Sequence, residues 1–266
     1  MPQPAILEAA MLAPASLPHW QLALLAAAGF ASGWINVIAG GGSLLTVPVM
    51  VFMGLPGPVA NGTNRIAIIA QNMTAVGAFF KNGLSDFRLS MSLAAAASIG
   101  AYFGAQVGVR LDGAAFNYVV ATVMLAVLVL MATGEDKAKP RPDATSSARN
   151  LVAGHLLMVG AGFWGGFIQI GVGFLMMPIL YRVMGLDLVR TNMHKVFIAL
   201  VFSFVALWVF AANAPIAWDA GIALAAGNAL GGWMGAHATI RRGEQFIKRA
   251  LFVVLIAMAI KLVFFR

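Results

Sequence analysis

The organisation of this chain follows from the stretch Gly40-Gly41-Gly42-Ser43-Leu44-Leu45-Thr46-Val47-Pro48. Its three glycines separate an apolar run that ends near Ile38 from a shorter one that ends near Met53. Glycine leaves the backbone flexible and its polar groups uncovered, so a continuous membrane helix is not expected to pass through unchanged. A related stretch, Gly171-Val172-Gly173 to Pro178, ends 130 residues after the first. Paired interruptions in two halves of a chain indicate the binding site of a transporter.

The composition is typical of a polytopic membrane protein. Of the 266 residues, 61% are hydrophobic and 10% are charged, whereas soluble domains carry about 25% charged residues. Repeated apolar runs are near the length of about 20 residues that a helix needs to cross a bilayer. The formal net charge is +8, but the basic residues lie in loops between apolar runs. This distribution fits membrane orientation, and we expect no nucleic-acid partner.

Ten apolar segments divide the chain into two halves of five. We expect residues 1–18 to be a disordered lead, because they lack the basic residues of a secretory signal peptide. The first transmembrane repeat is predicted over 19–133, a cytoplasmic linker over 134–150 and the second repeat over 151–266. The predicted segments lie near 20–38, 42–53, 66–80, 89–109, 114–133, 151–170, 174–184, 195–212, 216–238 and 247–265.

The two short segments, 42–53 and 174–184, determine the predicted topology. Neither spans ~30 Å at ~1.5 Å per residue, so each either turns back within the membrane or extends into its flanking loops. When each counts as a separate pass, most basic loops fall on one face of the membrane. The positive-inside rule therefore favours ten passes with both termini outside the cytoplasm. Five passes per half imply an all-α polytopic membrane protein with an inverted repeat of two five-segment halves.

The duplication extends beyond the glycine loops. Pro48 and Pro178, like Arg65 and Lys195, are 130 positions apart. A ladder of glycines at four-residue spacing also recurs, and we expect it to allow close helix packing. Its members are Gly100, Gly104 and Gly108 in the first half and Gly227, Gly231 and Gly235 in the second.

The glycine loops are the first candidate site. A helix beginning at Ser43 would direct its N–H groups and positive dipole end into the loop, and the loop before Phe174 would do the same from the opposite side. Anions suit such a place. The alternative is that the glycines only permit close packing.

Two polar stretches, Asn61-Gly62-Thr63-Asn64-Arg65 and Thr191-Asn192-Met193-His194-Lys195, are the second candidate. Arg65 and Lys195 are predicted to face a central cavity and neutralise an anion; the alternative is capping, with both cations snorkelling to the interface. Polar residues inside the segments, such as Asn36, Gln106, Gln169 and Asn228, line a cavity or, more commonly, bond between helices. The predicted substrate-binding residues are Gly40, Gly41, Gly42, Ser43, Asn61, Thr63, Asn64, Arg65, Gln71, Asn72, Gly171, Gly173, Asn192, His194 and Lys195.

Catalysis and metal binding find little support in the sequence. Ser43 and one of His155, His194 or His237 would be needed for serine hydrolysis, but no spacing supports such a pair. Four scattered histidines and no cysteine make a poor metal-ligand set. We therefore expect no catalytic residues, no metal and no cofactor. Buried carboxylates of the kind used for proton or sodium coupling are not evident either.

The same motifs resemble a known family. Gly40 to Pro48, then Gly54-Leu55-Pro56 and the stretch ending in Arg65, are similar to the first repeat of the sulfite exporter TauE/SafE family, part of the 4-toluene sulfonate uptake permease superfamily. The second repeat is similar from Gly171 to Pro178, then at Gly185-Leu186 and Thr191-Asn192. It departs at Gln169-Ile170-Gly171-Val172-Gly173, which lacks a full triple glycine.

The resemblance implies a carrier of sulfur-containing anions such as sulfite or organosulfonates in the bacterial inner membrane. We expect export by alternating access, driven for an anion by the inside-negative potential. The alternatives are a carrier of another organic anion, a cation carrier that uses Met and His, and an intramembrane enzyme. The expected partners are the small anion and the lipid bilayer, and a homodimer is left open.

Overall fold

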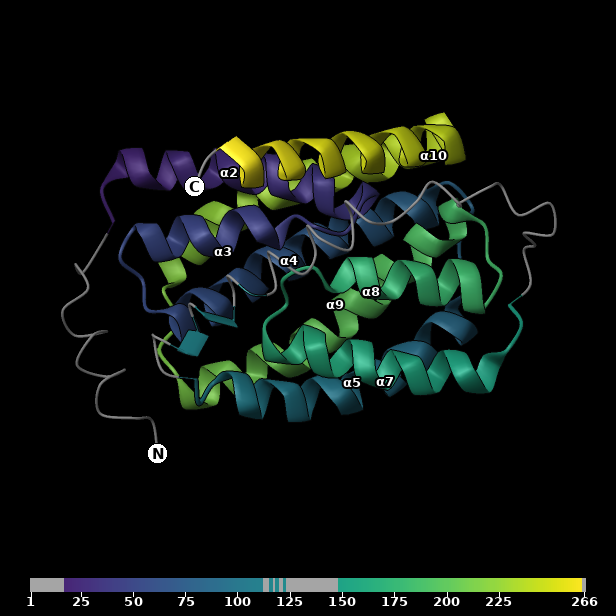
Figure 1. Ribbon diagram of the computed structural model, residues 1–266, viewed down its shortest axis with the longest axis horizontal. Helices are drawn as coiled ribbons and strands as arrows, with labels where there is room; N and C mark the ends of the chain where they lie inside the picture. Colours follow the sequence, from purple (N-terminus) through teal and green to yellow (C-terminus); the bar gives the residue numbers. More distant parts are fainter. Residues whose placement is uncertain (1–16, 112–114, 117, 120–121, 123–147, 265–266) are drawn as a thin grey trace.

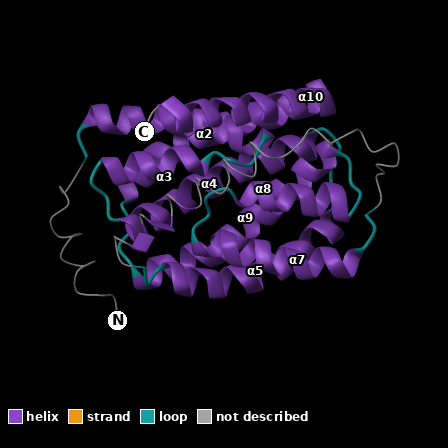
Figure 2. Cartoon of the chain, viewed as in Figure 1, coloured by secondary structure: helices purple, strands orange, loops and turns teal. Residues whose placement is uncertain are grey.

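The computed structural model describes residues 17–111, 115–116, 118–119, 122 and 148–264, and within these the regular elements are all helices (Figures 1 and 2). Most of the predicted segment 114–133, of the linker 134–150 and of the lead 1–18 lies outside the described residues. The helices are α2 (His19–Ile38), α3 (Ser43–Phe52), α4 (Gly57–Lys81), α5 (Phe87–Gly108), α7 (Leu151–Phe167), α8 (Val172–Pro178), η1 (Ile179–Val183), α9 (Leu188–Asn213) and α10 (Trp218–Phe264).

The two short segments form short helices, as their lengths predict. Helix α3 has 10 residues, and α8 has seven before it continues into the π-helical turn η1. The change to π geometry follows Pro178, which has no N–H to donate, and the Met184 amide donates to the Ile179 carbonyl at 2.9 Å. Each glycine loop is the turn between a long helix and a short one.

Helices α4 and α9 pack against each other in the interior of the bundle. Helix α10 lies against α2 and α4, and α5 lies against α7 and α9 (Figure 1). The two halves therefore pack in equivalent ways. The contacts of α10 with α2 and α4 correspond to the contacts of α5 with α7 and α9.

The glycine ladders allow this packing, as predicted. A Cβ atom added at Gly100 would lie 1.9 Å from the Val159 carbonyl oxygen of α7, and one added at Gly227 would lie 1.9 Å from the Ala26 carbonyl oxygen of α2. Neither contact leaves room for a side chain, so the helix backbones touch at the ladders.

Helices α4 and α9 begin earlier than the apolar pattern predicts. Helix α4 begins at Gly57, and α9 begins at Leu188, where the Asp187 carboxylate accepts a hydrogen bond from the Arg190 amide at 2.8 Å. Hydropathy misses these starts because polar residues follow within the first two turns, and most of these polar side chains are buried inside the protein. Arg65 is therefore the ninth residue of its helix and lies well inside it.

Helix α10 contains a sharp bend at Gly243, where φ is 65° and ψ is −160°. The bend lies between the predicted segments 216–238 and 247–265. Figure 1 shows the part after the bend returning toward the end of the molecule where α2 begins. Phe246, just after the bend, packs edge-on against Trp34 of α2, with ring centroids 6.3 Å apart.

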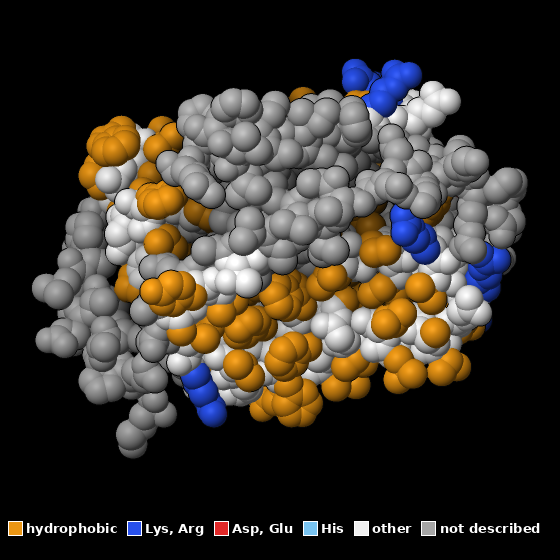
Figure 3. Space-filling view, viewed as in Figure 1, with side chains coloured by type: hydrophobic (Ala, Val, Ile, Leu, Met, Phe, Trp, Pro, Cys, Tyr) orange, Lys and Arg blue, Asp and Glu red, His pale blue; other side chains and the backbone are white. Residues whose placement is uncertain are grey.

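The surface of the bundle is rich in apolar side chains (Figure 3). Phe52, Phe80 and Trp208 are among the large apolar residues that are more than half exposed. Soluble monomers rarely expose contiguous apolar patches of this kind. By length and hydropathy, α2 and α9 qualify as membrane spans among the described helices, whereas α3, α7 and the α8–η1 segment are apolar but shorter.

Candidate functional site

The two glycine loops meet at the centre of the molecule. A Cβ atom added at Gly40 would lie 2.7 Å from the Cα atom of Gly173, and one added at Gly173 would lie 2.4 Å from the Cα atom of Gly40. Gly40 also has a φ of 94°, which favours glycine. A larger residue at either position would push the loops apart, so the contact between the loops requires glycine at both positions.

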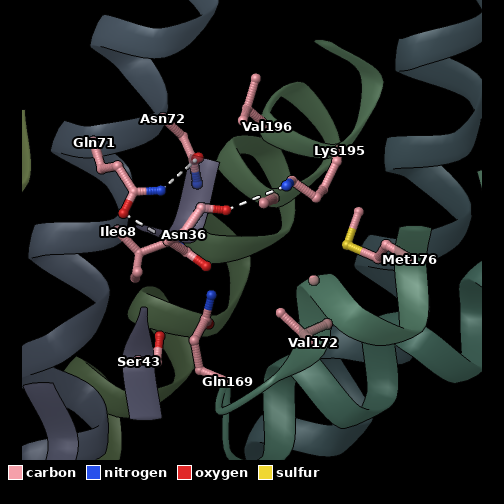
Figure 4. Close-up of a pocket in the computed structure, with 12 residues that line it drawn as sticks. Asn36, Ser43, Ile68, Gln71, Asn72, Gln169, Val172, Met176, Lys195 and Val196 are labelled. Atoms are coloured by element: carbon pink, nitrogen blue, oxygen red, sulfur yellow. Dashed lines mark hydrogen bonds between the residues drawn. The ribbon is translucent and has the colours of Figure 1, made fainter. Parts of the chain in front are cut away.

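A small cavity lies beside this contact (Figure 4). Its volume is about 10 Å³, near the minimum that holds one water molecule. Helices from both halves of the chain contribute to its wall. The lining residues are Asn36, Ser43, Ile68, Gln71, Asn72, Gln169, Val172, Gly173, Met176, Lys195, Val196 and Ala199.

The polar wall presents hydrogen-bond donors to the cavity. The Asn36 side-chain amide donates to the Gln71 side-chain oxygen at 3.2 Å, and the Gln71 amide donates to the Asn72 side-chain oxygen at 3.2 Å. This chain ends at the Asn72 amide nitrogen, which is buried and has no hydrogen-bond partner. In Figure 4 the Asn72 nitrogen points into the space between the lining residues. A buried donor without a partner is costly, so this one indicates a missing acceptor.

Lys195 is the charged residue of the wall, and no Asp or Glu is among the lining residues. Its ammonium group donates to the backbone carbonyls of Asn36 at 3.2 Å and Val37 at 2.8 Å, and to the Asn192 side-chain oxygen at 2.6 Å. Asn192 in turn donates to the Ile38 carbonyl at 3.3 Å. These carbonyls belong to the last turn of α2, where no helical N–H follows to bind them.

Arg65 binds the end of α7 in the corresponding way. Its guanidinium donates to the carbonyls of Gly165, at 3.1 Å, and Gly166, and to the Gln169 side-chain oxygen at 2.8 Å. Asn61 donates to the Phe167 carbonyl at 2.9 Å. Each cation thus neutralises the negative end of a helix from the other half of the chain. Within the described residues, no carboxylate forms an ion pair with either cation.

Gln169 connects Arg65 to the cavity, and sequence reasoning did not place it among the binding residues. It follows the end of α7 by two positions, as Gly40 follows the end of α2, and its φ is 61°. Positive φ is uncommon for residues other than glycine and clusters at functional sites. The sequence contains one signal for Gln169: in the second glycine motif, a glutamine stands where the first motif has Gly40.

The predicted binding residues divide into three groups by position. Ser43, Gln71, Asn72, Gly173 and Lys195 line the cavity. The others near it support its wall, because they lie in the two loops or bond, directly or through Arg65, to the groups that line it. This second group contains Gly40, Gly41, Gly42, Gly171, Asn61, Asn64, Arg65 and Asn192.

Thr63 and His194 lie away from the cavity. The Thr63 hydroxyl accepts a hydrogen bond from the Ala217 amide at 3.1 Å, just before α10. The His194 Nδ1 atom lies 2.8 Å from the Ser90 hydroxyl on α5. Thr63 therefore joins α4 to the residue before α10, and His194 joins α9 to α5.

Within the described residues no hydrogen bond joins Ser43 to a histidine, and His194 and His155 bond instead to the hydroxyls of Ser90, at 2.8 Å, and Ser92, at 3.0 Å. The Ser43 hydroxyl accepts from the Asn64 amide at 3.3 Å, whereas His155 and His237 bond to backbone carbonyls in their own helices. Among the described residues, no group of three or more His, Cys, Asp or Glu could hold a metal ion.

Comparison with known proteins places this chain in a family. The model of the family "Sulfite exporter TauE/SafE" matches residues 25–262. No solved structure shows a significant match.

Curated relatives span nearly the same length. A "Probable membrane transporter protein" of Haemophilus influenzae is 25% identical over 91% of this chain and 94% of its own. A "Probable membrane transporter protein ORF9" of a Sinorhizobium species is 25% identical over 91% and 92%, respectively. The "Probable membrane transporter protein YfcA" of Escherichia coli K12 is 24% identical over 88% and 86%. The chain therefore belongs to the sulfite exporter TauE/SafE family of membrane transporters.

Proposed function

We propose that this protein is a secondary transporter that exports small sulfur-containing anions, such as sulfite or organosulfonates, by alternating access. The observation that carries the proposal is the wall of the cavity, which combines the Lys195 ammonium with the unpartnered Asn72 amide and includes no carboxylate. An oxyanion would accept a hydrogen bond from the Asn72 amide and would be attracted by the Lys195 charge, which could exchange one of its three bonds for the anion. A cation in the same place would meet the Lys195 charge without a counter-charge.

The start of α3 adds to this preference. Ser43 is the first residue of the ten-residue helix α3 and lines the cavity. The N-terminal end of a helix carries a partial positive charge and free N–H groups, which favour anions. The choice of a sulfur-containing anion rests on the family, since the donors would serve other small oxyanions as well.

The size of the cavity supports a mechanism with moving parts. A volume of about 10 Å³ is too small for sulfite, which has four non-hydrogen atoms. The loops that meet at Gly40 and Gly173 must separate, at least on one side, before an anion enters. We infer that the described conformation is a closed state between two open ones.

We also propose an inverted repeat with ten passes and both termini outside the cytoplasm. Figure 1 supports inversion, because α2 and α7 run in opposite directions across the molecule. Figure 3 shows most visible Lys and Arg side chains at the end where α7 begins, which would be cytoplasmic by the positive-inside rule. Cysteines at positions 143 and 245 should then react with an impermeant thiol reagent from the cytoplasmic side only.

Transport is tested with purified protein in liposomes. Vesicles loaded with sulfite should take up labelled sulfite by counterflow, and sulfoacetate should compete. Sulfate and acetate test whether the donors select among oxyanions, since acetate represents the competing proposal of a carrier for other organic anions. Turnover of a substrate without flux would support an enzyme and overturn the proposal.

An Asn72→Leu variant is the specific control for the cavity. It removes the unpartnered amide but keeps the approximate size of the side chain. We expect the rate of counterflow to fall about tenfold, because the loss of one hydrogen bond to a charged group costs about 1.5 kcal/mol. Asn228→Leu is the matched control, because Asn228 is also buried on a packed helix but does not line the cavity.

A further inference from the structure

We infer that the end of α2 is a binding site for a monovalent cation and that the chain fills this site with its own Lys195 ammonium. The site is made of the Asn36 and Val37 carbonyls and the Asn192 side-chain oxygen. Its consequence for transport rests on the function proposed above: anion movement would need no sodium or potassium ion.

The geometry is that of an ion cage. Three oxygen atoms surround the ammonium nitrogen at 2.6–3.2 Å. Two of them are backbone carbonyls at the C-terminal end of a helix, where the partial negative charge of the helix collects. The third, from Asn192, is held in place because the same side chain donates to the Ile38 carbonyl. Oxygen atoms in such an arrangement suit a hard monovalent cation as well as an ammonium group.

The location is where a transporter would bind a coupling ion. In carriers with interrupted helices, carbonyls at half-helix C-terminal ends coordinate sodium ions or protons, while N-terminal ends face the anionic substrate. Here the last turn of α2 and the first turn of α3 lie on either side of one glycine loop. Lys195 borders the cavity that Ser43 also lines. A cation at this cage therefore lies close enough to an anion in the cavity to stabilise it.

The other half has a cage of the same design. Arg65 occupies it with bonds to the Gly165 and Gly166 carbonyls. Both cages are thus filled by covalently attached cations, and the charge that an ion would supply is permanent. This accounts for the absence of carboxylates from the cavity wall, since a protein that recruits an ion from solution would need negative charge to attract it.

Removal of the Lys195 side chain should expose the vacant cage to solvent cations. The experiment compares the Tm of the purified Lys195→Ala protein in sodium, potassium and choline chloride at equal concentration. We expect the Tm in sodium or potassium chloride to be about 4 °C higher than in choline chloride, because an ion bound at saturating concentration stabilises the folded protein. The wild-type Tm should change by less than about 1 °C between these salts.

A second variant identifies the site. Lys195→Ala combined with Asn192→Leu lacks one of the three cage oxygens, so the salt effect should disappear. Lys195→Met, which keeps the bulk but not the charge, should also show no salt effect, because its side chain fills the cage. An equal Tm of the folded Lys195→Ala protein in all three salts would overturn the inference.

Flux measurements with the wild type give a test that does not depend on the variants. Anion counterflow should be the same within about twofold when choline replaces sodium and potassium on both sides of the vesicle. If counterflow by the wild type requires sodium or potassium, the inference is overturned. This result holds even if the Lys195→Ala protein does not fold. If the wild type moves no anion at all, the proposed function fails, whereas the Tm comparison still decides whether the cage binds a cation.

Discussion

Arg65 and Lys195 bind the ends of two equivalent helices, but they differ in what else they touch. Lys195 borders the cavity directly. Arg65 is fully buried, lies 4.6 Å from the centroid of the Phe210 ring, and reaches the cavity only through Gln169. The cation that binds the end of α2, Lys195, therefore lies at the cavity. The cation that binds the end of α7, Arg65, is separated from the cavity by Gln169.

The chemistry of the two side chains explains this division. The planar guanidinium of Arg65 offers five donors in a fixed fork, which suits two adjacent carbonyls and a side-chain amide at once. The ammonium of Lys195 is a compact point charge that can turn its three donors. An ammonium can keep some bonds to α2 and exchange another for an anion. A change of contacts during transport is therefore easier at Lys195 than at Arg65.

Removal of the Arg65 side chain should have the largest effect on stability. Arg65→Ala leaves the Gly165 and Gly166 carbonyls buried without donors, at about 1–3 kcal/mol each. We expect the Tm of the purified protein to fall by about 10 °C, measured by tryptophan fluorescence. Arg65→Lys should recover part of this loss, because it keeps the charge with fewer donors. A Tm for Arg65→Ala within 2 °C of the wild type would show that the cation is not a structural cap.

Replacement of Lys195 by a neutral donor should affect transport more than stability. Lys195→Gln keeps a donor for the Val37 carbonyl but removes the charge that faces the cavity. A hydrogen bond to a charged group is worth about 1.5–3 kcal/mol, so we expect the initial rate of sulfite counterflow to fall by about 10–100-fold. Lys195→Arg is the matched control, since it keeps the charge. If Arg65→Lys lowers the rate more than Lys195→Gln does, the assignment of the two roles is reversed.

Gln169 tests the link between Arg65 and the cavity. Gln169→Gly removes the side-chain amide from the cavity wall. It also relieves backbone strain, because a positive φ costs a residue other than glycine about 1 kcal/mol. We expect counterflow to fall about tenfold while the Tm stays within about 3 °C of the wild type. Gly40→Ala is the converse change at the equivalent position, because it adds a Cβ atom 2.7 Å from Gly173. It should lower the Tm, and an unchanged Tm would contradict the close contact of the loops.

Much of the helical arrangement could be predicted from the sequence, because glycines, prolines and apolar runs act locally. The predicted segments 42–53 and 89–109 match α3 (Ser43–Phe52) and α5 (Phe87–Gly108) within two residues. The starts of α4 and α9 could not be predicted in the same way. Polar residues follow within the first two turns, and two of them, Asn61 and Asn192, bond to the Phe167 and Ile38 carbonyls of the other half of the chain. Hydropathy along one segment does not contain such contacts.

The candidate site could be predicted only in outline. The glycine loops and the two cations point to the region of the candidate cavity, since a cation within a membrane segment and an interrupted helix are visible in the sequence. The partners of the cations were not visible, because the carbonyls of Val37 and Gly166 are backbone atoms that any residue could supply. Asn36 and Gln169 were recognised only as polar residues within the segments, and their place on the cavity depends on how α2 and α7 end.

His194 gives the smallest predicted effect and tests how local the site is. It lies next to Lys195 in the sequence, and motif reasoning placed both among the binding residues. On a helix, however, adjacent residues point about 100° apart, and the His194 ring bonds to Ser90 on α5. His194→Gln, which can keep a bond to that hydroxyl, should leave counterflow within about twofold of the wild type and lower the Tm only slightly. A fall of more than fivefold at unchanged Tm would mean that α9 presents His194 as well as Lys195 to the anion, and the cavity would then have to extend toward α5 when it opens.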